Sequence, residues 1–311
     1  MNAHTAVRIA FALLLGIATT AQAQLFRAYV ASDGNDANPC TLPQPCRLLP
    51  KALTVVNSGG EIWMLDSANF NTGTVTIDKS VSILAIPGAV GSIVALNGGA
   101  AVSITAPSLR VVLRNVVIGP VAGAAAGTDG VSMTGASSLL IEKSVIAGMP
   151  TNGIYVSDGN LRVFETTIRD SGKGVLVEAA GRAVIASSRL LDNADGVFAN
   201  ANLGAGPVMT ISVDDTIISG GISGVRCAAG DLCEAHVAVA RSTITGTAKG
   251  VNCTATAAGT GIAQVVIGGS KLVYNAAGWT LFLNATLSSL GDNQIHGNGA
   301  STGTLTPLAP Q

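Results

Sequence analysis

The sequence predicts an all-β parallel β-helix, a solenoid in which three sheets run along about 8 to 10 stacked coils. The first observation is a degenerate repeat that recurs every 22 to 28 residues from about residue 110 to the C-terminus. The second is that each repeat contains three short apolar runs separated by turns. The third is that these runs are rich in Val, Ile and Thr and are broken by Gly, Asn and Asp, which favours strands over helices.

Each repeat contains an aliphatic residue, called here the anchor, preceded two positions earlier by a residue that is usually hydroxylated. The anchors are Ile118, Ile146, Ile168, Leu190, Ile218, Ile244, Leu272 and Ile295. A polar turn then leads to a Gly–aliphatic pair, whose glycines are Gly130, Gly153, Gly174, Gly196, Gly224, Gly250 and Gly278. Coils stacked about 4.8 Å apart would place equivalent residues in columns, so that residues one repeat apart become neighbours in space.

Residues 1–23 have the pattern of a signal peptide, which is not part of the mature fold. Arg8 gives a positive start, residues 9–17 are apolar, and Ala21 to Ala23 match a small-x-small cleavage site. The apolar run is shorter than the roughly 20 residues that a membrane-spanning helix needs. We therefore expect a secreted or periplasmic protein, cleaved near Ala23, with no transmembrane segment.

Residues 24–60 do not follow the repeat and are expected to form a strand, a loop and a short helix. The helix is expected over residues 47–57, which carry apolar residues at helical spacing, and Gly59-Gly60 would follow its end. A solenoid needs a cap over the core of its first coil, and this helix is placed to supply one. The β-helix is expected over residues 61–300, followed by a tail at residues 301–311.

The composition excludes several classes of partner. The chain has 48% hydrophobic and 11% charged residues and a net charge of −1. There is consequently no electrostatic basis for binding nucleic acid or an anionic membrane surface.

The five cysteines fit an oxidising compartment. Cys40 and Cys46 lie in a Pro-rich loop and are expected to close it with a disulfide. Cys227 and Cys253 occupy the same inward position one coil apart, and Cys233 lies in the loop after Cys227. A second disulfide is expected among these three, and the sequence leaves all three pairings open. No Cys-x-x-Cys pair exists and His residues are few, so no metal site is expected.

The N-terminal segment carries a more specific resemblance. A strand, the loop Ser32 to Asp36, a Pro-Cys segment, a helix, Gly59-Gly60 and the segment Asp78 to Ile83 follow one another in this order. This order resembles bacterial secreted proteins of the pectin-lyase-like, right-handed parallel β-helix superfamily. The resemblance covers nearly the whole mature chain and implies right-handed coils. It does not imply one function, because the superfamily holds lyases, polygalacturonases, esterases, epimerases, phage tailspikes and adhesins.

Alignment of the repeats brings one group of ionisable residues together. The turn that contains Asp170 and Lys173 superposes on the turn that contains Asp192 and Asp195, 22 residues later. Asp170 should then lie about 5 Å from Asp192, and Lys173 equally near Asp195. These four residues are the candidates for acid–base chemistry. The alternative is that they are ordinary turn residues, with Lys173 and Asp195 forming an exposed ion pair worth less than about 1 kcal/mol.

The adjacent strands present four outward residues in one column, namely Tyr155, Leu176, Phe198 and Arg226. An aromatic and apolar strip with a cation at one end could bind a sugar chain, so these residues are the candidate ligand contacts. The alternative is that the loop over residues 200–207 covers the strip.

No cofactor is expected, although Asp33, Asn35 and Asp36 offer oxygen atoms that could bind Ca²⁺ weakly. The loop lacks the later Glu of an EF-hand, and turn formation is the simpler interpretation.

The expected function is that of a non-catalytic exported protein that binds a glycan, the cell envelope or another surface partner. One alternative is a carbohydrate-active enzyme, a polysaccharide lyase or hydrolase acting on acidic polysaccharide. The other is a structural surface component. Aromatic residues make up only 4% of the chain, which argues against many sugar subsites, and the missing clusters of carboxylates argue against an enzyme.

Overall fold

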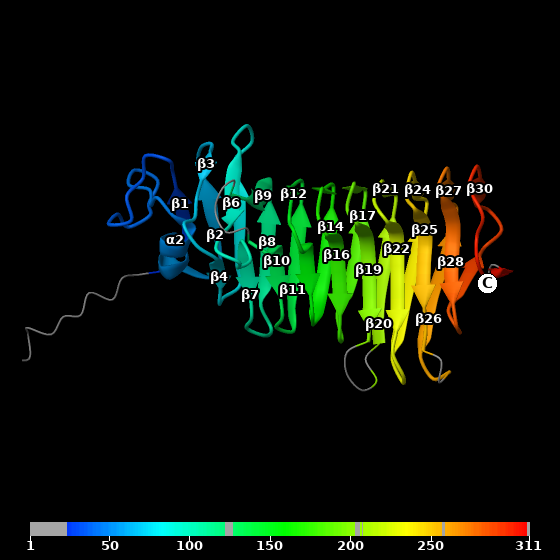
Figure 1. The fold of residues 1–311 in the computed structure, drawn as a ribbon. Coiled ribbons are helices and arrows are strands. Elements are labelled where there is room, and N and C mark those ends of the chain that lie inside the picture. The colour runs from blue at the N-terminus through cyan, green and yellow to red at the C-terminus, as the bar shows by residue number, and fades with distance from the viewer. Residues whose placement is uncertain (1–23, 122–126, 203–205, 207, 257–258, 310–311) are drawn as a thin grey trace, which may run out of the picture.

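A computed structural model describes residues 24–121, 127–202, 206, 208–256 and 259–309. The expected signal peptide, residues 1–23, lies outside the described residues. The described chain forms three parallel sheets that wind together as a β-helix, with the N-terminal segment at one end and the C-terminal strands at the other (Figure 1). The predicted fold class is confirmed. Within the described residues, no helix is long and apolar enough to cross a membrane.

The sheets are numbered here in the order in which each coil visits them. Sheet 1 has twelve strands: β1 Leu25–Val30, β2 Val56–Met64, β5 Val81–Ala85, β8 Arg110–Arg114, β11 Ser137–Glu142, β14 Gly159–Phe164, β17 Arg182–Ala186, β20 Val208–Asp214, β23 Glu234–Ala240, β26 Ile262–Gly268, β29 Thr286–Ser289 and β31 Leu305–Pro307. Sheet 2 has ten short strands: β3 Ala68–Asn69, β6 Gly91–Ala95, β9 Val116–Pro120, β12 Val145–Ala147, β15 Thr167–Arg169, β18 Arg189–Leu191, β21 Ile217–Ser219, β24 Thr243–Thr245, β27 Lys271–Val273 and β30 Gln294–His296. Sheet 3 has nine strands: β4 Val75–Ile77, β7 Val102–Ile104, β10 Asp129–Met133, β13 Asn152–Val156, β16 Lys173–Glu178, β19 Asp195–Ala201, β22 Ser223–Ala229, β25 Lys249–Thr254 and β28 Ala277–Phe282.

The anchors form one continuous column inside sheet 2. Ile168 pairs with Leu190, Leu190 pairs with Ile218, and each of these residues is at most 1% exposed. Residues one repeat apart therefore lie on adjacent strands, as the sequence predicted.

The hydroxylated residue before each anchor serves the backbone of the neighbouring coil. The Ser188 hydroxyl accepts the N–H of Thr166 at 3.2 Å and donates to the carbonyl of Ala186 at 2.8 Å. The same arrangement recurs at Ser144, Thr166, Thr216, Ser242 and Ser270. The residue just before each of these adopts a positive φ, as at Glu165 and Ser187 with φ of 47° and 49°. The hydroxyls thus satisfy backbone groups at the corner between sheets 1 and 2.

The glycines of the repeat form a second column, at the start of the strands of sheet 3. A Cβ built on Gly196 would lie 2.6 Å from the carbonyl oxygen of Gly224 and 2.6 Å from Cγ2 of Ile218. Gly130, Gly153, Gly224 and Gly250 face the next glycine and an aliphatic side chain of sheet 2 at similarly short distances. Neighbouring coils approach so closely here that a side chain does not fit.

The capping helix α2 spans Leu49–Val55 and buries Leu49, Ala52 and Leu53 against the first coils. It is shorter than the expected helix, because the chain is already part of sheet 1 at Val56, where β2 pairs with β1. Gly59 and Gly60 consequently lie within a strand instead of after a helix.

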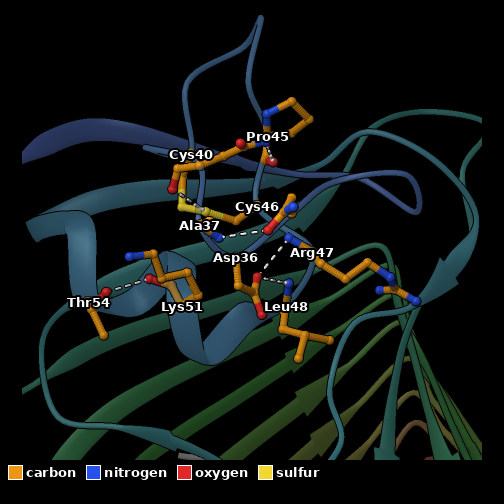
Figure 2. Close-up of a disulfide and its surroundings, with 11 residues drawn as sticks. Asp36, Ala37, Cys40, Pro45, Cys46, Arg47, Leu48, Lys51 and Thr54 are labelled. Carbon is orange, nitrogen blue, oxygen red and sulfur yellow. Dashed lines mark hydrogen bonds between the residues drawn. A yellow bond between two sulfur atoms is a disulfide. The ribbon is translucent and has the colours of Figure 1, made fainter.

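The loop before this helix is fixed by the disulfide between Cys40 and Cys46 and by Asp36 (Figure 2). The Asp36 carboxylate accepts the backbone N–H groups of Arg47 and Leu48 at 2.8 and 2.9 Å. The Cys40–Cys46 bridge is the one that the Pro-rich loop predicted.

The other three cysteines are buried thiols in this structure. Cys227 pairs in register with Cys253, and the Cys227 Sγ lies 3.3 Å from the carbonyl oxygen of Ala235. The hydrogen bond with Cys227 and burial both raise the pKa of Cys253. The expected second disulfide is not formed. For Cys227 and Cys253 the reason is that paired residues of a parallel sheet direct their side chains alongside one another and not toward each other.

The C-terminal segment adds to the solenoid as far as the structure describes it. β31 pairs with β29, and the Trp279 indole donates to the carbonyl of Gly303 at 3.0 Å. The N–H of Leu308 donates to the carbonyl of Ser289 at 2.8 Å. The segment expected to form a C-terminal tail thus supplies one more strand, β31.

Candidate ligand-binding face

The outer face of sheet 3 brings together the four expected ligand contacts. Tyr155, Leu176, Phe198 and Arg226 are successive register partners on β13, β16, β19 and β22. The predicted column exists because each strand starts at an equivalent point of its repeat.

Two members of this column are less accessible than the sequence suggested. Leu176 and Phe198 are each only 6% exposed and form a small apolar cluster with Ala228, against which Tyr155 packs. The guanidinium of Arg226 lies over the Phe198 ring, 4.3 Å from its centre. Leu176 and Phe198 therefore form a floor beneath the polar groups and are not open to direct stacking with a ligand.

Glu178 links two side chains at the edge of this floor through hydrogen bonds. It accepts the Tyr155 hydroxyl at 3.1 Å and the Asn200 amide at 2.7 Å. Burial raises the pKa of Tyr155, and the charge of Glu178 and its hydrogen bond add to the effect. Tyr155 is consequently a neutral hydrogen-bonding group over the physiological pH range.

A second column begins the strands of sheet 3 and contains Asp129, Asn152, Lys173 and Asp195. Asp195 and Lys173 pair in register, as predicted, but the ion pair of Asp195 is formed with Arg226 at 3.0 Å. The expected Lys173–Asp195 ion pair is thus replaced by one from the following coil. The Asp195 side chain is only 9% exposed and the Arg226 side chain 43%.

Asp129 stands at the other end of this column. Burial raises its pKa, while the hydrogen bond from Asn152 at 2.7 Å and the charge of Lys173 act in the opposite direction. Desolvation is the largest influence, so the neutral acid is favoured at Asp129 more than at a carboxyl in water.

The remaining two candidates, Asp170 and Asp192, lie at the corner between sheets 2 and 3. Both have positive φ, 54° and 53°, and the N–H of Asp170 donates to the carbonyl of Leu191 at 3.1 Å. They are neighbours at the backbone, as predicted. The Asp170 carboxylate is ion-paired with the adjacent Arg169. This ion pair lies at the surface, since about half of each side chain is exposed.

The structure also reports on metal binding. Among the described residues, no three His, Cys, Asp or Glu side chains gather as a metal site would require. In the N-terminal loop, Asp36 accepts backbone donors and Asn35 accepts the N–H of Ala37 at 2.9 Å. These oxygen atoms are engaged in holding the loop.

Sequence reasoning missed Asp129, Glu178 and Asn200. Asp129 extends the column of Lys173 and Asp195 toward the N-terminus, two coils before Lys173. Glu178 and Asn200 pair with each other two residues after Leu176 and Phe198 on the same strands. Carrying the repeat alignment over whole strands would have found all three.

Comparison with known proteins places this geometry among β-helices. A family profile described as a right-handed β-helix region matches residues 92–267. The comparison with curated sequences finds no match. Solved structures similar to this chain include the pectate lyase Pel9A, which is 14% identical to it and has a TM-score of 0.61. That match covers 94% of this chain and 80% of the pectate lyase chain. A polygalacturonase from Erwinia carotovora ssp. carotovora has 12% identity, coverage of 95% and 97%, and a TM-score of 0.62. XylC in complex with xylose has 9% identity, coverage of 87% and 70%, and a TM-score of 0.64. At these identities the likeness shows the fold alone.

Proposed function

Because this chain belongs to the right-handed β-helix family, we propose that it is an exported, non-catalytic protein that binds a glycan along the outer face of sheet 3. The glycan would belong to a polysaccharide or to the cell envelope. No role in binding nucleic acid is proposed, since the net charge is −1.

The observation that carries the proposal is the position of Arg226. Its guanidinium lies over the Phe198 ring and is ion-paired with Asp195, so two contacts hold it in place while 43% of its side chain stays exposed. Lys173, the Tyr155 hydroxyl and Asn252 lie on neighbouring positions of the same face. An extended chain running along the axis would meet such groups at intervals of about 4.8 Å.

The pairing of the carboxylates supports binding over catalysis. Asp195 bonds Arg226, Asp170 bonds Arg169, and Glu178 accepts from Tyr155 and Asn200. Each of these carboxylates is thus already engaged by side chains of the protein itself.

The names of the similar structures agree with a carbohydrate ligand. They include a pectate lyase, a polygalacturonase and a protein in complex with xylose. A second candidate, a lyase or hydrolase acting on acidic polysaccharide, is favoured by one observation, the raised pKa of Asp129 near Lys173. A carboxyl that keeps its proton at higher pH is suited to donate it to a leaving group.

The test uses the mature chain and two lysine variants. Lys173→Gln removes a cation from the candidate face, and Lys271→Gln removes one from the first position of β27 in sheet 2. Binding to polygalacturonate, xylan and alginate is measured by calorimetry. We expect Lys173→Gln to weaken binding about tenfold, the value of one charged hydrogen bond, and Lys271→Gln to leave it unchanged. Equal affinities of both variants and the wild type would refute the location.

The same polymers separate binding from catalysis. Ultraviolet absorbance of unsaturated products and release of reducing ends are followed for the wild type and for Asp129→Asn. Turnover that Asp129→Asn abolishes would establish the enzyme and overturn the non-catalytic proposal. Binding without turnover supports it.

A further inference from the structure

The outer face of sheet 1 carries two arginines without partners. Arg162 lies on β14 and Arg182 on the adjacent β17, both exposed. Arg182 pairs in register with Asn160, two residues before Arg162, so the two arginines are diagonal neighbours on one face. In the part of the chain that the structure describes, neither guanidinium has an ion pair or a side-chain hydrogen bond. By contrast, Arg114 on the same sheet pairs with Glu142.

A depression of about 370 Å³ lies between these arginines. Its walls include Asn160, Thr210 and His236, and none of the described residues that line it carries a carboxylate. The ring nitrogens of His236 are engaged by Glu234 at 2.9 Å and by Gln264 at 3.2 Å. The depression is therefore positively charged and offers hydroxyl and amide groups beside the two guanidiniums.

The floor of the depression is apolar. Val184 pairs in register with Arg162, is flanked by Arg182 two residues earlier on its own strand, and is 39% exposed. Ala238 lines the same depression two strands further on. Exposed aliphatic side chains beside guanidinium groups suit a ring with an apolar face and a charged substituent.

These observations fit an anionic sugar better than a free inorganic anion. A planar guanidinium binds an oxyanion through two parallel hydrogen bonds, and a pair of guanidiniums favours a carboxylate or a sulfate ester. The C–H face of a pyranose would cover Val184, and its hydroxyls would reach Asn160 and Thr210. Arg110, whose guanidinium likewise has no ion pair or side-chain hydrogen bond among the described residues, stands in the same column as Arg182, three strands toward the N-terminus. The column thus continues along the axis, as a polymer ligand requires.

We infer that the outer face of sheet 1 is a second binding site, which takes an anionic saccharide through Arg162 and Arg182. This site shares no residue with the face of sheet 3 and does not depend on the function proposed there. The shared chemistry is an oxyanion on a sugar ring, and its carboxylate and sulfate forms are separated by the ligands used below.

The test measures calorimetric affinity and stoichiometry for oligogalacturonate, dextran sulfate and neutral dextran. The variants are Arg162→Gln, Arg182→Gln and the double variant, with Arg189→Gln as the control. Arg189 is exposed, lies on sheet 2 and likewise has no ion pair among the described residues. Thermal unfolding of each variant verifies that the fold is intact.

We expect an anionic polymer to bind the wild type, each single variant to lose about tenfold in affinity and the double variant more. Arg189→Gln should keep this binding. Preference for oligogalacturonate or for dextran sulfate identifies the oxyanion, and either supports the site. The inference is overturned if neutral dextran binds equally well, if inorganic sulfate competes as effectively as the polymer, or if the double variant binds like the wild type. Loss of binding in Lys173→Gln alone would locate the ligand on sheet 3 and also overturn it.

Discussion

A single added methyl group at Gly196 should destabilise the solenoid. The Cβ of Gly196→Ala would lie 2.6 Å from the carbonyl oxygen of Gly224 and 2.6 Å from Cγ2 of Ile218. Neither atom can move freely, because Gly224 belongs to the backbone of the next coil and Ile218 is 1% exposed. The Gly196 backbone does not adopt a positive φ, so the cost of this substitution is steric and not conformational.

The expected magnitude follows from two opposing effects. Alanine lowers the conformational entropy of the unfolded chain and would by itself stabilise the protein by about 0.4–1 kcal/mol. Overpacking a closely packed site costs about 1–3 kcal/mol and occasionally more. Since both contacts fall well below ordinary separation, the steric cost should dominate, with a net loss of about 1–2 kcal/mol.

Urea unfolding followed by circular dichroism measures this loss as a shift of the midpoint at unchanged slope. The control is Gly73→Ala, where no atom lies within 4 Å of the added Cβ and φ is not positive. This variant should be neutral or slightly more stable than the wild type. If Gly196→Ala unfolds at the same urea concentration as Gly73→Ala, the coils are not in the close contact that the glycine column requires.

Three further predictions concern stability. Reduction of the Cys40–Cys46 bridge, whose cysteines are 6 residues apart, should cost about 2 kcal/mol by loop entropy, and an unchanged unfolding temperature in dithiothreitol would contradict this. Arg226→Gln should cost about 1–3 kcal/mol because it leaves the carboxylate of Asp195 without its cation, and wild-type stability of the variant in urea would exclude that pairing. Burial raises the pKa of Asp129 above 3.8, so the folded state keeps this proton to higher pH than the unfolded chain, and wild-type stability falls as pH rises through that interval. Asp129→Asn lacks this loss and should gain stability relative to the wild type as pH rises above about 3.8, in urea unfolding measured over a pH series.

The repeat allowed the sequence to predict columns of residues but not their contacts. Period and anchor spacing determine which residues stack, so the column from Tyr155 to Arg226 was correct. Asp195 forms its ion pair with Arg226 and not with its register partner Lys173. This choice depends on how far each side chain extends, which the spacing of the repeat does not predict. The burial of Phe198 likewise depends on its neighbours across the strand and not on its outward direction alone.

Local signals were misleading where long-range pairing competes with them. The helix expected to continue to residue 57 ends at Val55, because Val56 pairs with Leu25 of β1. The identity of Val56 alone does not decide between helix and strand. Pairing with Leu25 of β1, 31 positions earlier, places it in a strand. The position of the disulfide, by contrast, needed only the short Pro-rich loop around Cys40 and Cys46.

The last strand of sheet 1 has a consequence for self-association. Leu308 donates its N–H to β29, so alternation along the strand directs the N–H position of Pro307 to the opposite, unpaired edge. Proline has no hydrogen to offer there, and an incoming strand would find one donor missing. End-to-end association of two molecules through this edge of the sheet is thereby disfavoured.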